Sequence, residues 1–354
     1  MLYREAGQFK TSYAADQAIF PLAQDRIGMA IILAVAFIAI PALANDYWLQ
    51  TIMTPFLILS LAALGLNVLT GYAGQLSLGT GGFMAVGAFA AYKFATAFPE
   101  MNIIVVFLIS GLISAAVGIV FGVPSLRIKG FYLAVATLAA QFFLLWLLVK
   151  YPWFYNYDPS GVISAPPIDI FGFAIDTAAS KYMLTLVIVS VLALATKNLV
   201  RSHIGRGWMA IRDMDIAAEI IGFRPLTTKL SAFAVSSFLV GVAGAMYAFL
   251  YLGSVEAAAF DITTSFNILF MVIVGGLGSV LGSFIGAAFI LTLPIFLDNF
   301  PRMLGFEISV ETVTHLQFMI FGALIIFFLI VEPHGLARLW TITKEKLRVW
   351  PFPY

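Results

Sequence analysis

The fold is decided by an apolar run that ends in a glycine-rich break. Residues 52–70 read IMTPFLILSLAALGLNVLT, and the residues that follow, 71–82, read GYAGQLSLGTGG. The first part carries no charge and is long enough to cross a hydrocarbon core of about 30 Å, which needs about 20 apolar helical residues. Non-helical backbone at membrane depth is tolerated only where protein or a water-filled cavity satisfies its polar groups. The stretch therefore predicts a transmembrane helix that ends in an interrupted segment inside a helical bundle.

The same apolar character continues through the chain. Hydrophobic residues make up 62% and charged residues 10% of its 354 residues, against about 45–50% and about 25% in soluble domains. A soluble fold cannot hide this much apolar surface, so the excess faces lipid. We predict an all-α integral membrane protein with about 8–10 transmembrane helices. The apolar segments are 27–44, 52–70, 78–98, 101–122, 131–149, 181–199, 227–252, 265–297 and 314–332.

One of these segments, 265–297, is too long for a single crossing. Gly275, Gly276, Gly278 and Gly282 interrupt it. It either crosses twice or forms a re-entrant hairpin, and both alternatives return the chain to the same side. They give about ten or about eight crossings in total.

The placement of Lys and Arg sets the orientation, because cytoplasmic loops of membrane proteins are enriched in both. With the N-terminus inside, 15 of the 19 Lys and Arg residues fall in inside regions and four fall outside. Both chain ends are then cytoplasmic. The predicted parts are a cytosolic or interfacial segment, 1–26, a transmembrane domain, 27–333, and a cytosolic tail, 334–354. Residues 150–180 form an outside loop and residues 200–226 an inside loop.

Several classes of function lack their sequence signature. No Asp, Glu, Arg or Lys falls near the centre of a predicted span, and Asp261 is expected to be solvated on the outside. Because ionisable residues inside a membrane mark proton relays, a proton-coupled carrier is disfavoured. The chain has no cysteine, no Gly-x-x-x-x-Gly-Lys-Ser/Thr loop and three isolated histidines, so metal, nucleotide and catalytic-triad sites are not expected. A net charge of +1 gives no reason to expect nucleic-acid binding.

Two glycine-broken segments, 71–82 and 275–286, carry polar groups that are candidates to line a path. In transporters, one such segment in each half of the chain points to a central site at a repeat interface. The alternative is close packing, because small residues at four-residue spacing let helices approach. The residues leave both alternatives open. The predicted pathway residues are Asn67, Tyr72, Gln75, Ser77, Gln141, Gly276, Gly278 and Ser279.

The inside loop has a helical pattern over residues 205–223. The apolar side chains of this pattern are Met209, Ile211, Ile216 and Ile220, and the charged ones are Arg212, Asp213, Asp215 and Glu219. Gly222 predicts the end of the helix. A short helix between two spans, with Trp208 at its head, suits docking into a groove of a partner protein. The alternative is packing on the chain's own bundle or on lipid headgroups.

Three long motifs follow one another along the chain. The first, Leu-Asn-x-x-x-Gly-Tyr-x-Gly-Gln-x-Ser-x-Gly, occupies 66–79. The second, Gly-Arg-x-x-x-Ala-Ile-Arg-x-x-x-x-Ala-Ala-x-x-x-Gly, occupies 205–222, and the third, Gly-Gly-x-Gly-Ser-x-x-Gly, occupies 275–282. A closing Glu-Pro-x-Gly-Leu signature occupies 332–336. From about Leu61 to Leu339 the chain thus resembles the permeases of branched-chain amino-acid ABC importers, specifically the M-type subunit.

The resemblance implies a subunit of the bacterial inner membrane with a fold like that of type II importers. The implied partners are a homologous permease, two cytosolic ABC ATPases that bind ATP and Mg²⁺, and a periplasmic substrate-binding protein. No cofactor and no enzymatic site are implied for this chain itself. Implied substrates are branched-chain or other hydrophobic amino acids, while similar subunits carry urea, amides or aromatic acids. The inside loop becomes the coupling helix, with coupling residues Arg206, Ile211, Arg212, Asp213, Asp215, Glu219 and Gly222.

Two other hypotheses belong to different classes of function. Neutral oxygens around Asn67, Gln75 and Ser77 can bind sodium without a carboxylate, which describes a stand-alone sodium-coupled carrier or channel. A membrane enzyme is the weaker hypothesis, because no acid, base, nucleophile or metal cluster lies at a suitable depth.

Overall fold

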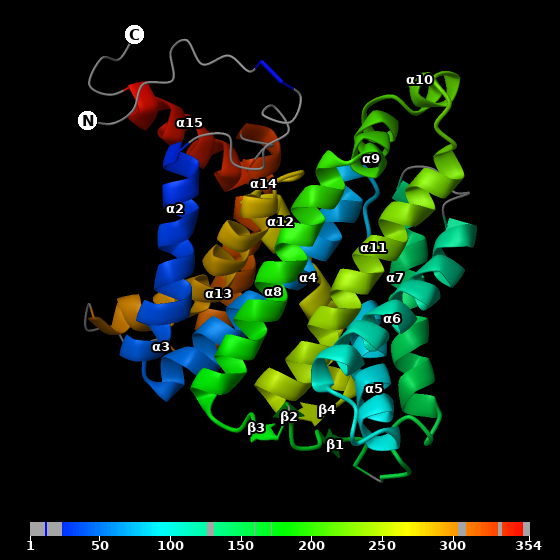
Figure 1. The fold of residues 1–354 in the computed structure, drawn as a ribbon, viewed down its shortest axis with the longest axis vertical. Coiled ribbons are helices and arrows are strands. Elements are labelled where there is room, and N and C mark those ends of the chain that lie inside the picture. The colour runs from blue at the N-terminus through cyan, green and yellow to red at the C-terminus, as the bar shows by residue number, and fades with distance from the viewer. Residues whose placement is uncertain are drawn as a thin grey trace.

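The protein is a bundle of long helices (Figure 1). The computed structural model describes residues 11–12, 23–125, 131–158, 160–170, 172–303, 309–331 and 335–349. Within these ranges the regular structure is helical apart from two short antiparallel β-ribbons, in which β1 pairs with β4 and β2 with β3. The predicted all-α membrane fold is confirmed. Most of the predicted segment 1–26, and the end of the predicted tail, lie outside the described residues.

The helices and strands have the following bounds. The first half holds α2 (Ala23–Ala34), η1 (Val35–Ala39), α3 (Ile40–Leu43), η2 (Trp48–Met53), α4 (Thr54–Asn67), η3 (Val68–Tyr72), α5 (Thr80–Ala97), α6 (Ile103–Ser125) and α7 (Phe131–Lys150). The second half holds β1 (Ile163–Ser164), β2 (Asp169–Ile170), β3 (Phe173–Ala174), α8 (Ala178–Arg201), α9 (His203–Asp213), α10 (Asp215–Ile220), α11 (Pro225–Met246), η4 (Tyr247–Leu252), β4 (Ser254–Val255), η5 (Ala257–Phe260), α12 (Ile262–Gly275), α13 (Val280–Met303), α14 (Val310–Val331) and α15 (Gly335–Val349). Segments η1 to η4 are π-helical, and η5 is a 3₁₀ turn.

The number of membrane crossings follows from the helix lengths. Among the described residues, nine helical segments are long and apolar enough to cross a membrane. They are Arg26–Leu43, Trp48–Tyr72, Ile103–Pro124, Tyr132–Lys150, Ala178–Arg201, Pro225–Leu252, Ala257–Gly275, Val280–Asn299 and Glu311–Phe328. The long segment predicted at 265–297 is thus two helices, α12 and α13. Residues 73–97, an extended stretch followed by α5, are not among these nine segments.

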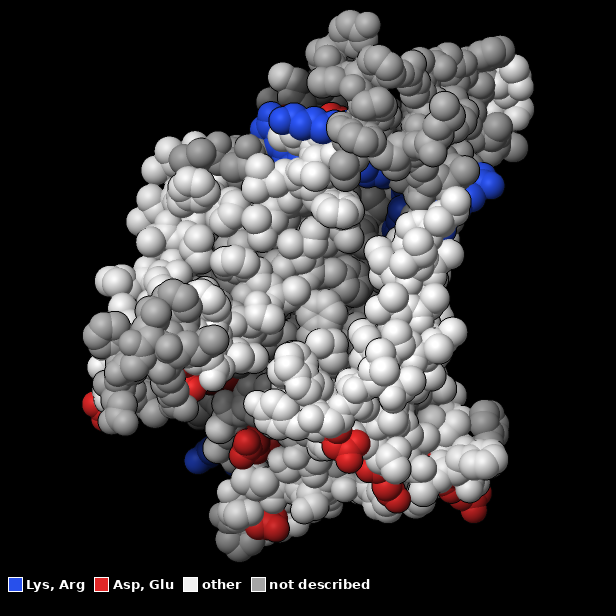
Figure 2. Space-filling view, turned by 90° about the vertical axis from the view of Figure 1, so that its left-hand side faces the viewer, with Lys and Arg blue, Asp and Glu red and all other residues white. Residues whose placement is uncertain are grey.

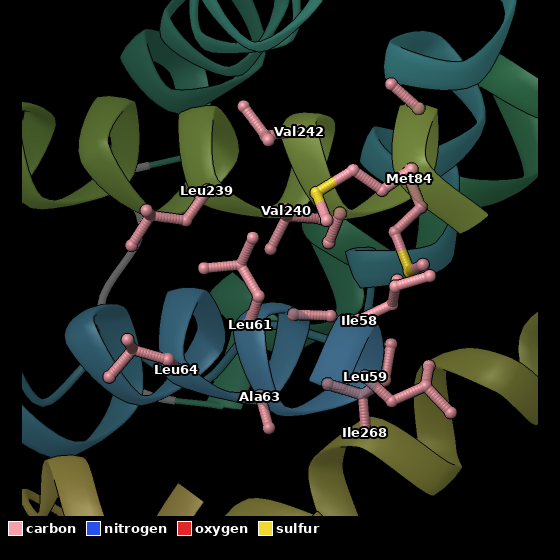
Figure 3. Packing of buried hydrophobic residues seen from close by; sticks show 14 of the residues in the cluster. Ile58, Leu59, Leu61, Ala63, Leu64, Met84, Leu239, Val240, Val242 and Ile268 are labelled. Carbon is pink, nitrogen blue, oxygen red and sulfur yellow. The ribbon is translucent and has the colours of Figure 1, made fainter. Parts of the chain in front are cut away.

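Helix α4 lies at the centre of the bundle. Most residues of its span, Trp48–Tyr72, are buried, whereas none in the peripheral span Arg26–Leu43 is fully buried. A helix that is apolar on all sides is stable only when it is surrounded by protein or lipid, and α4 is surrounded by protein. Figure 3 shows Ile58 and Leu61 of α4 facing Val240 of α11, with Ile268 of α12 on the other side. This core places the end of α4 inside the molecule.

Glycines allow α5 to approach α11 at backbone distance. A Cβ added at Gly87 would overlap the backbone of Gly241, and one at Gly244 would overlap the backbone of Met84. Small residues of this kind drive association of membrane helices, where van der Waals packing replaces the hydrophobic effect. Helix α5 is therefore held closely against α11.

Several helix starts carry a side-chain cap. Thr177 accepts a hydrogen bond from Ser180 N at the start of α8, and Ser202 accepts one from Ile204 N at the start of α9. These caps satisfy backbone N–H groups that have no partner within the helix. Pro225 opens α11 at a position where the missing N–H costs nothing.

The loops predicted to lie inside and outside are at opposite ends of the bundle. Helices α9, α10 and α15 lie at one end and strands β1 to β4 at the other (Figure 1). On the face seen in Figure 2, Lys and Arg gather toward the α9–α10 end, while Asp and Glu gather toward the strand end. The chain therefore has a cation-rich end and an acidic end, with the membrane-spanning helices between them.

Candidate functional site: the junction of the broken helices

The two glycine-rich breaks lie against each other, although about 200 residues separate them in sequence. The Asn67 side chain at the end of α4 donates to Ser279 O at 2.8 Å and to Ser283 Oγ at 2.9 Å, and it accepts from Gly278 N at 2.8 Å. A Cβ added at Gly71 would overlap Gly278 N. Residues 67–71 and 276–283 therefore form one junction, which we call the glycine junction.

Asn67 acts at this junction as a clamp. Its side chain is 0% exposed. Both the amide N–H groups and the amide oxygen make hydrogen bonds, and Gly276 O is a further acceptor at 3.4 Å. Buried amides are stable when they are fully hydrogen-bonded. Asn67 is thus fully hydrogen-bonded between the two breaks, and its assignment to the pathway stays a prediction. Gly276, Gly278 and Ser279 lie beside Asn67 at the junction.

Gln141 belongs to a second junction, between the starts of α5 and α12. Gly82 N donates to Gln141 Oε1, and Gln141 Nε2 donates to Phe260 O at 2.8 Å. Ser265 Oγ accepts from Gly81 N at 2.8 Å. The first N–H groups of a helix have no partner within the helix, and here the side chains of Gln141 and Ser265 supply partners for α5. The sequence pattern gave no signal for Ser265, because its partners come from a helix far away in the chain.

The second junction also changes the expected position of Asp261. Gln141 lies midway along α7, so the hydrogen bond to Phe260 O places the residue before Asp261 well inside the bundle. Asp261 is half-buried and caps α12, accepting from Thr264 N at 2.9 Å. The prediction of an outside, solvated Asp261 is wrong, because the chain re-enters the bundle after η4 before α12 begins.

The extended stretch 73–79 connects the two junctions. Tyr72, Gln75 and Ser77 are buried on or beside it, and Ser77 Oγ accepts from Gly79 N at 3.4 Å. The side-chain amide of Gln75 has no hydrogen-bond partner among the described residues, nor does the hydroxyl of Thr70. A buried polar group without a partner costs about 1–3 kcal/mol. Gln75 is therefore the predicted pathway residue whose amide is available to another molecule.

The inside loop forms two helices instead of the one predicted. Met214, with φ −154° and ψ 94°, separates α9 from α10. Trp208 is fully buried and donates from Nε1 to Ser231 Oγ at 2.8 Å, and Ile211 is also buried. These two residues therefore pack on the chain's own bundle and not on a partner protein, because α9 lies along α11. Gly222, with φ +102°, ends the pair of helices as predicted.

Helix α10 carries the outward apolar face of the loop. Met214, Ile216, Ile220 and Ile221 are each more than 70% exposed. Exposed contiguous apolar side chains of this kind mark surfaces that bind protein or membrane. Around them, Arg206, Asp213 and Glu219 are exposed and Asp215 is half-buried.

Arg212 faces the bundle. Its Nη1 donates to Gly71 O at 2.8 Å, and its Nε donates to Asp213 Oδ1 at 2.8 Å. The hydrogen bond from Arg212 holds the pKa of the Asp213 carboxyl below its usual value. One of the predicted coupling residues thus touches the glycine junction directly.

Comparison with known proteins agrees with this architecture. Residues 48–329 match the family described as branched-chain amino acid transport system / permease component. The chain belongs to this family. The match includes both junctions and α9 and α10, so the permease is a multi-pass membrane transport protein built around the broken helices.

Individual relatives are distant in sequence. The permease is 27% identical over 321 residues to the high-affinity branched-chain amino acid transport system permease protein LivM of Salmonella typhimurium, covering 84% of this chain and 71% of the relative. The Escherichia coli K12 protein of the same name gives the same identity and coverage. A probable branched-chain amino acid transport permease protein LivM of Methanocaldococcus jannaschii is 24% identical over 239 residues, 66% of this chain and 68% of the relative. No solved structure matches.

Proposed function

We propose that this permease is one membrane subunit of an ATP-driven importer. Its partners are a homologous permease subunit, two cytosolic ABC ATPases and a periplasmic binding protein. ATP and Mg²⁺ are bound by the ATPases, in keeping with the lack of a phosphate loop in this sequence. The observation that carries the proposal is the apolar face of α10, where Ile216 and Ile220 are 72% and 81% exposed at the end of the bundle.

The proposed orientation puts this face in the cytoplasm. Lys and Arg gather at the α9–α10 end (Figure 2), and cytoplasmic loops of membrane proteins carry an excess of both. The N- and C-termini are then cytoplasmic and the strand end is periplasmic. A short helix with Ile216 and Ile220 outward suits a hydrophobic groove on an ATPase. Exposure of this face in the cytosol is relieved when the ATPase covers it.

The proposed substrates are branched-chain or other hydrophobic amino acids, moved from periplasm to cytoplasm. The names of the bacterial relatives support this class. Urea, short amides and aromatic acids are other solutes that would suit the predicted pathway. Apart from Asp261, the charged residues of the spans lie away from the polar groups of this pathway. Selection among these solutes is assigned to the binding protein.

The sodium-coupled carrier is less well supported. The Asn67 oxygen accepts from Gly278 N, and Ser77 Oγ accepts from Gly79 N. Each of these oxygens already accepts a hydrogen bond from a backbone N–H, which leaves one lone pair for a cation. Of the three groups proposed for sodium, Gln75 alone has an uncommitted oxygen within the described part of the chain.

The test is the affinity of the purified ATPase for the permease with Ile216→Ser and Ile220→Ser combined. Full burial of each isoleucine contributes about 1.5–3 kcal/mol, so binding should weaken by at least about tenfold. Ile342→Ser on α15, at the same end, is the matched control and should bind normally. Unchanged binding by the double variant would remove the docking role of α10.

A further inference from the structure

Arg212 connects α9 to the glycine junction through several contacts. Besides the bond from Nη1 to Gly71 O, its stem packs on Gly74, where an added Cβ would lie 2.8 Å from Arg212 Cγ. A Cβ added at Gly278 would lie 3.5 Å from Arg212 Nη1. The guanidinium therefore lies where both breaks meet. Only 36% of its side chain is exposed.

The Gly71 carbonyl is a natural partner for a cation. The helix formed by α4 and η3 ends at Tyr72, so its last carbonyls lack continuing helical N–H groups. The C-terminal end of a helix also carries partial negative charge, which a cation stabilises. Arg212 supplies both the hydrogen-bond donor and the charge at this end.

The backbone next to the Arg212 guanidinium consists of glycines. Two of them have positive φ angles, and a third has no room for a side chain. Gly74 has φ +68° and Gly278 has φ +74°, values that glycine adopts without strain. Gly71 has no room for a Cβ. A shift of Arg212 therefore acts directly on close-packed backbone, in a stretch that is otherwise held by the bonds from Gln75 N to Leu69 O at 3.0 Å and from Leu78 N to Thr137 Oγ1 at 2.9 Å.

Helix α10 is joined almost directly to Arg212, so a displacement of α10 is transmitted to this residue. Met214 alone separates α9 from α10, and the neighbouring Asp213 pairs with Arg212 Nε. In contrast, Trp208 and Ile211 fix the rest of α9 to the bundle. The C-terminal end of α9 is thus the part that moves together with α10.

We propose that Arg212 is a positioning residue that latches the extended stretch 73–79 closed and releases it when α10 is displaced. The inference rests on the proposed function, because the ATPases displace α10. Loss of the bond to Gly71 O frees Gly71, and with it the stretch that follows, to move away from Gly278. Gln75, whose amide has no partner among the described residues, then becomes accessible to the transported solute.

The first test measures opening of the stretch in the full-length permease in membrane vesicles, without ATP or partners. The chain has no native cysteine, so Ser77→Cys, a buried position on the stretch, is a clean reporter. The rate of thiol labelling at a buried site follows the fraction of open molecules. Adding Arg212→Gln should raise this rate by roughly 10- to 100-fold, the range that corresponds to one hydrogen bond to a charged group.

Three matched variants separate latch release from general damage. Arg212→Lys keeps a charged donor and should restore part of the slow labelling. Arg224→Gln removes the same charge from another exposed site of the loop and should leave the rate unchanged. Ser110→Cys reports on α6, where the serine is fully buried, and its labelling should not respond to Arg212→Gln. Equal labelling of Ser77→Cys with and without Arg212→Gln, or equal acceleration of Ser110→Cys, would overturn the latch.

The second test uses the complete transporter in proteoliposomes. Arg212→Gln should retain ATP hydrolysis while the solute moved per ATP falls about tenfold or more, and Arg212→Lys should recover part of it. Normal coupling in Arg212→Gln would also overturn the latch. If the wild-type complex moves no solute with ATP, the importer proposal fails, and the labelling experiment still decides the latch because it needs no ATPase.

Discussion

Replacement of Asn67 by alanine should loosen the joint between the two halves of the chain. The variant loses the bonds to Ser279 O, Ser283 Oγ and Gly278 N, at 2.8, 2.9 and 2.8 Å. Hydrogen bonds between membrane helices contribute about 0.6 kcal/mol each on average, and a buried group left without a partner costs about 1–3 kcal/mol. Gly278 N is left unpaired, whereas Ser279 O keeps the hydrogen bond from Ser283 N at 3.2 Å. Together with the other lost bonds, this predicts a loss of about 2–4 kcal/mol in the free energy of unfolding.

The measurement is denaturant unfolding of the purified permease in detergent micelles. Asn299→Ala is the matched control, because Asn299 is exposed and its amide donates within its own helix, to Ile295 O. That variant should change the free energy of unfolding by less than about 0.5 kcal/mol. If Asn67→Ala unfolds at the same midpoint as Asn299→Ala, the clamp assigned to Asn67 is refuted.

Three further variants probe the loop and the junction. Gly71→Ala should abolish a monodisperse fold in size-exclusion chromatography because its Cβ overlaps the facing backbone, whereas Gly28→Ala, with open space around it, should be normal. Trp208→Phe loses the bond to Ser231 and should cost about 0.5–1.5 kcal/mol in the same unfolding assay; no loss would show that this bond is dispensable. The lowered pKa of Asp213 means that its pairing stabilises the folded state above the unfolded pKa of about 4 and that this contribution disappears as pH falls through the folded-state value. Asp213→Asn should therefore flatten the acid side of the stability profile, and an unchanged profile would contradict the pairing.

Much of the fold is predictable from sequence because lipid imposes a simple rule on composition. Uncharged apolar runs become spanning helices, and glycine clusters mark where helices break. The double crossing at 265–297 was left open for a physical reason. A glycine break is equally compatible with a turn inside the membrane and with a turn at its surface.

Side-chain roles were harder to predict because partners come from distant segments. Asn67 and Gln141 were predicted to line the pathway, which stays a prediction. Their hydrogen bonds with Gly278 N and Phe260 O were not predicted, because these bonds depend on helix packing. Periodicity placed the inside loop on one helix, while the extended backbone at Met214 divides it and turns α10 outward. The contact between Arg212 and Gly71 joins positions 141 residues apart, and no local pattern reports it.

The central claim is that ATP bound by partner subunits drives solute through this permease. The most direct measurement is uptake of radiolabelled leucine by proteoliposomes that contain the permease with its co-purified partners, with ATP on the ATPase side. We expect uptake that requires ATP, the ATPases and the binding protein together, with no uptake by the permease alone under a sodium gradient. Sodium-driven uptake by the permease alone, or uptake by the complex that is indifferent to ATP, would contradict it.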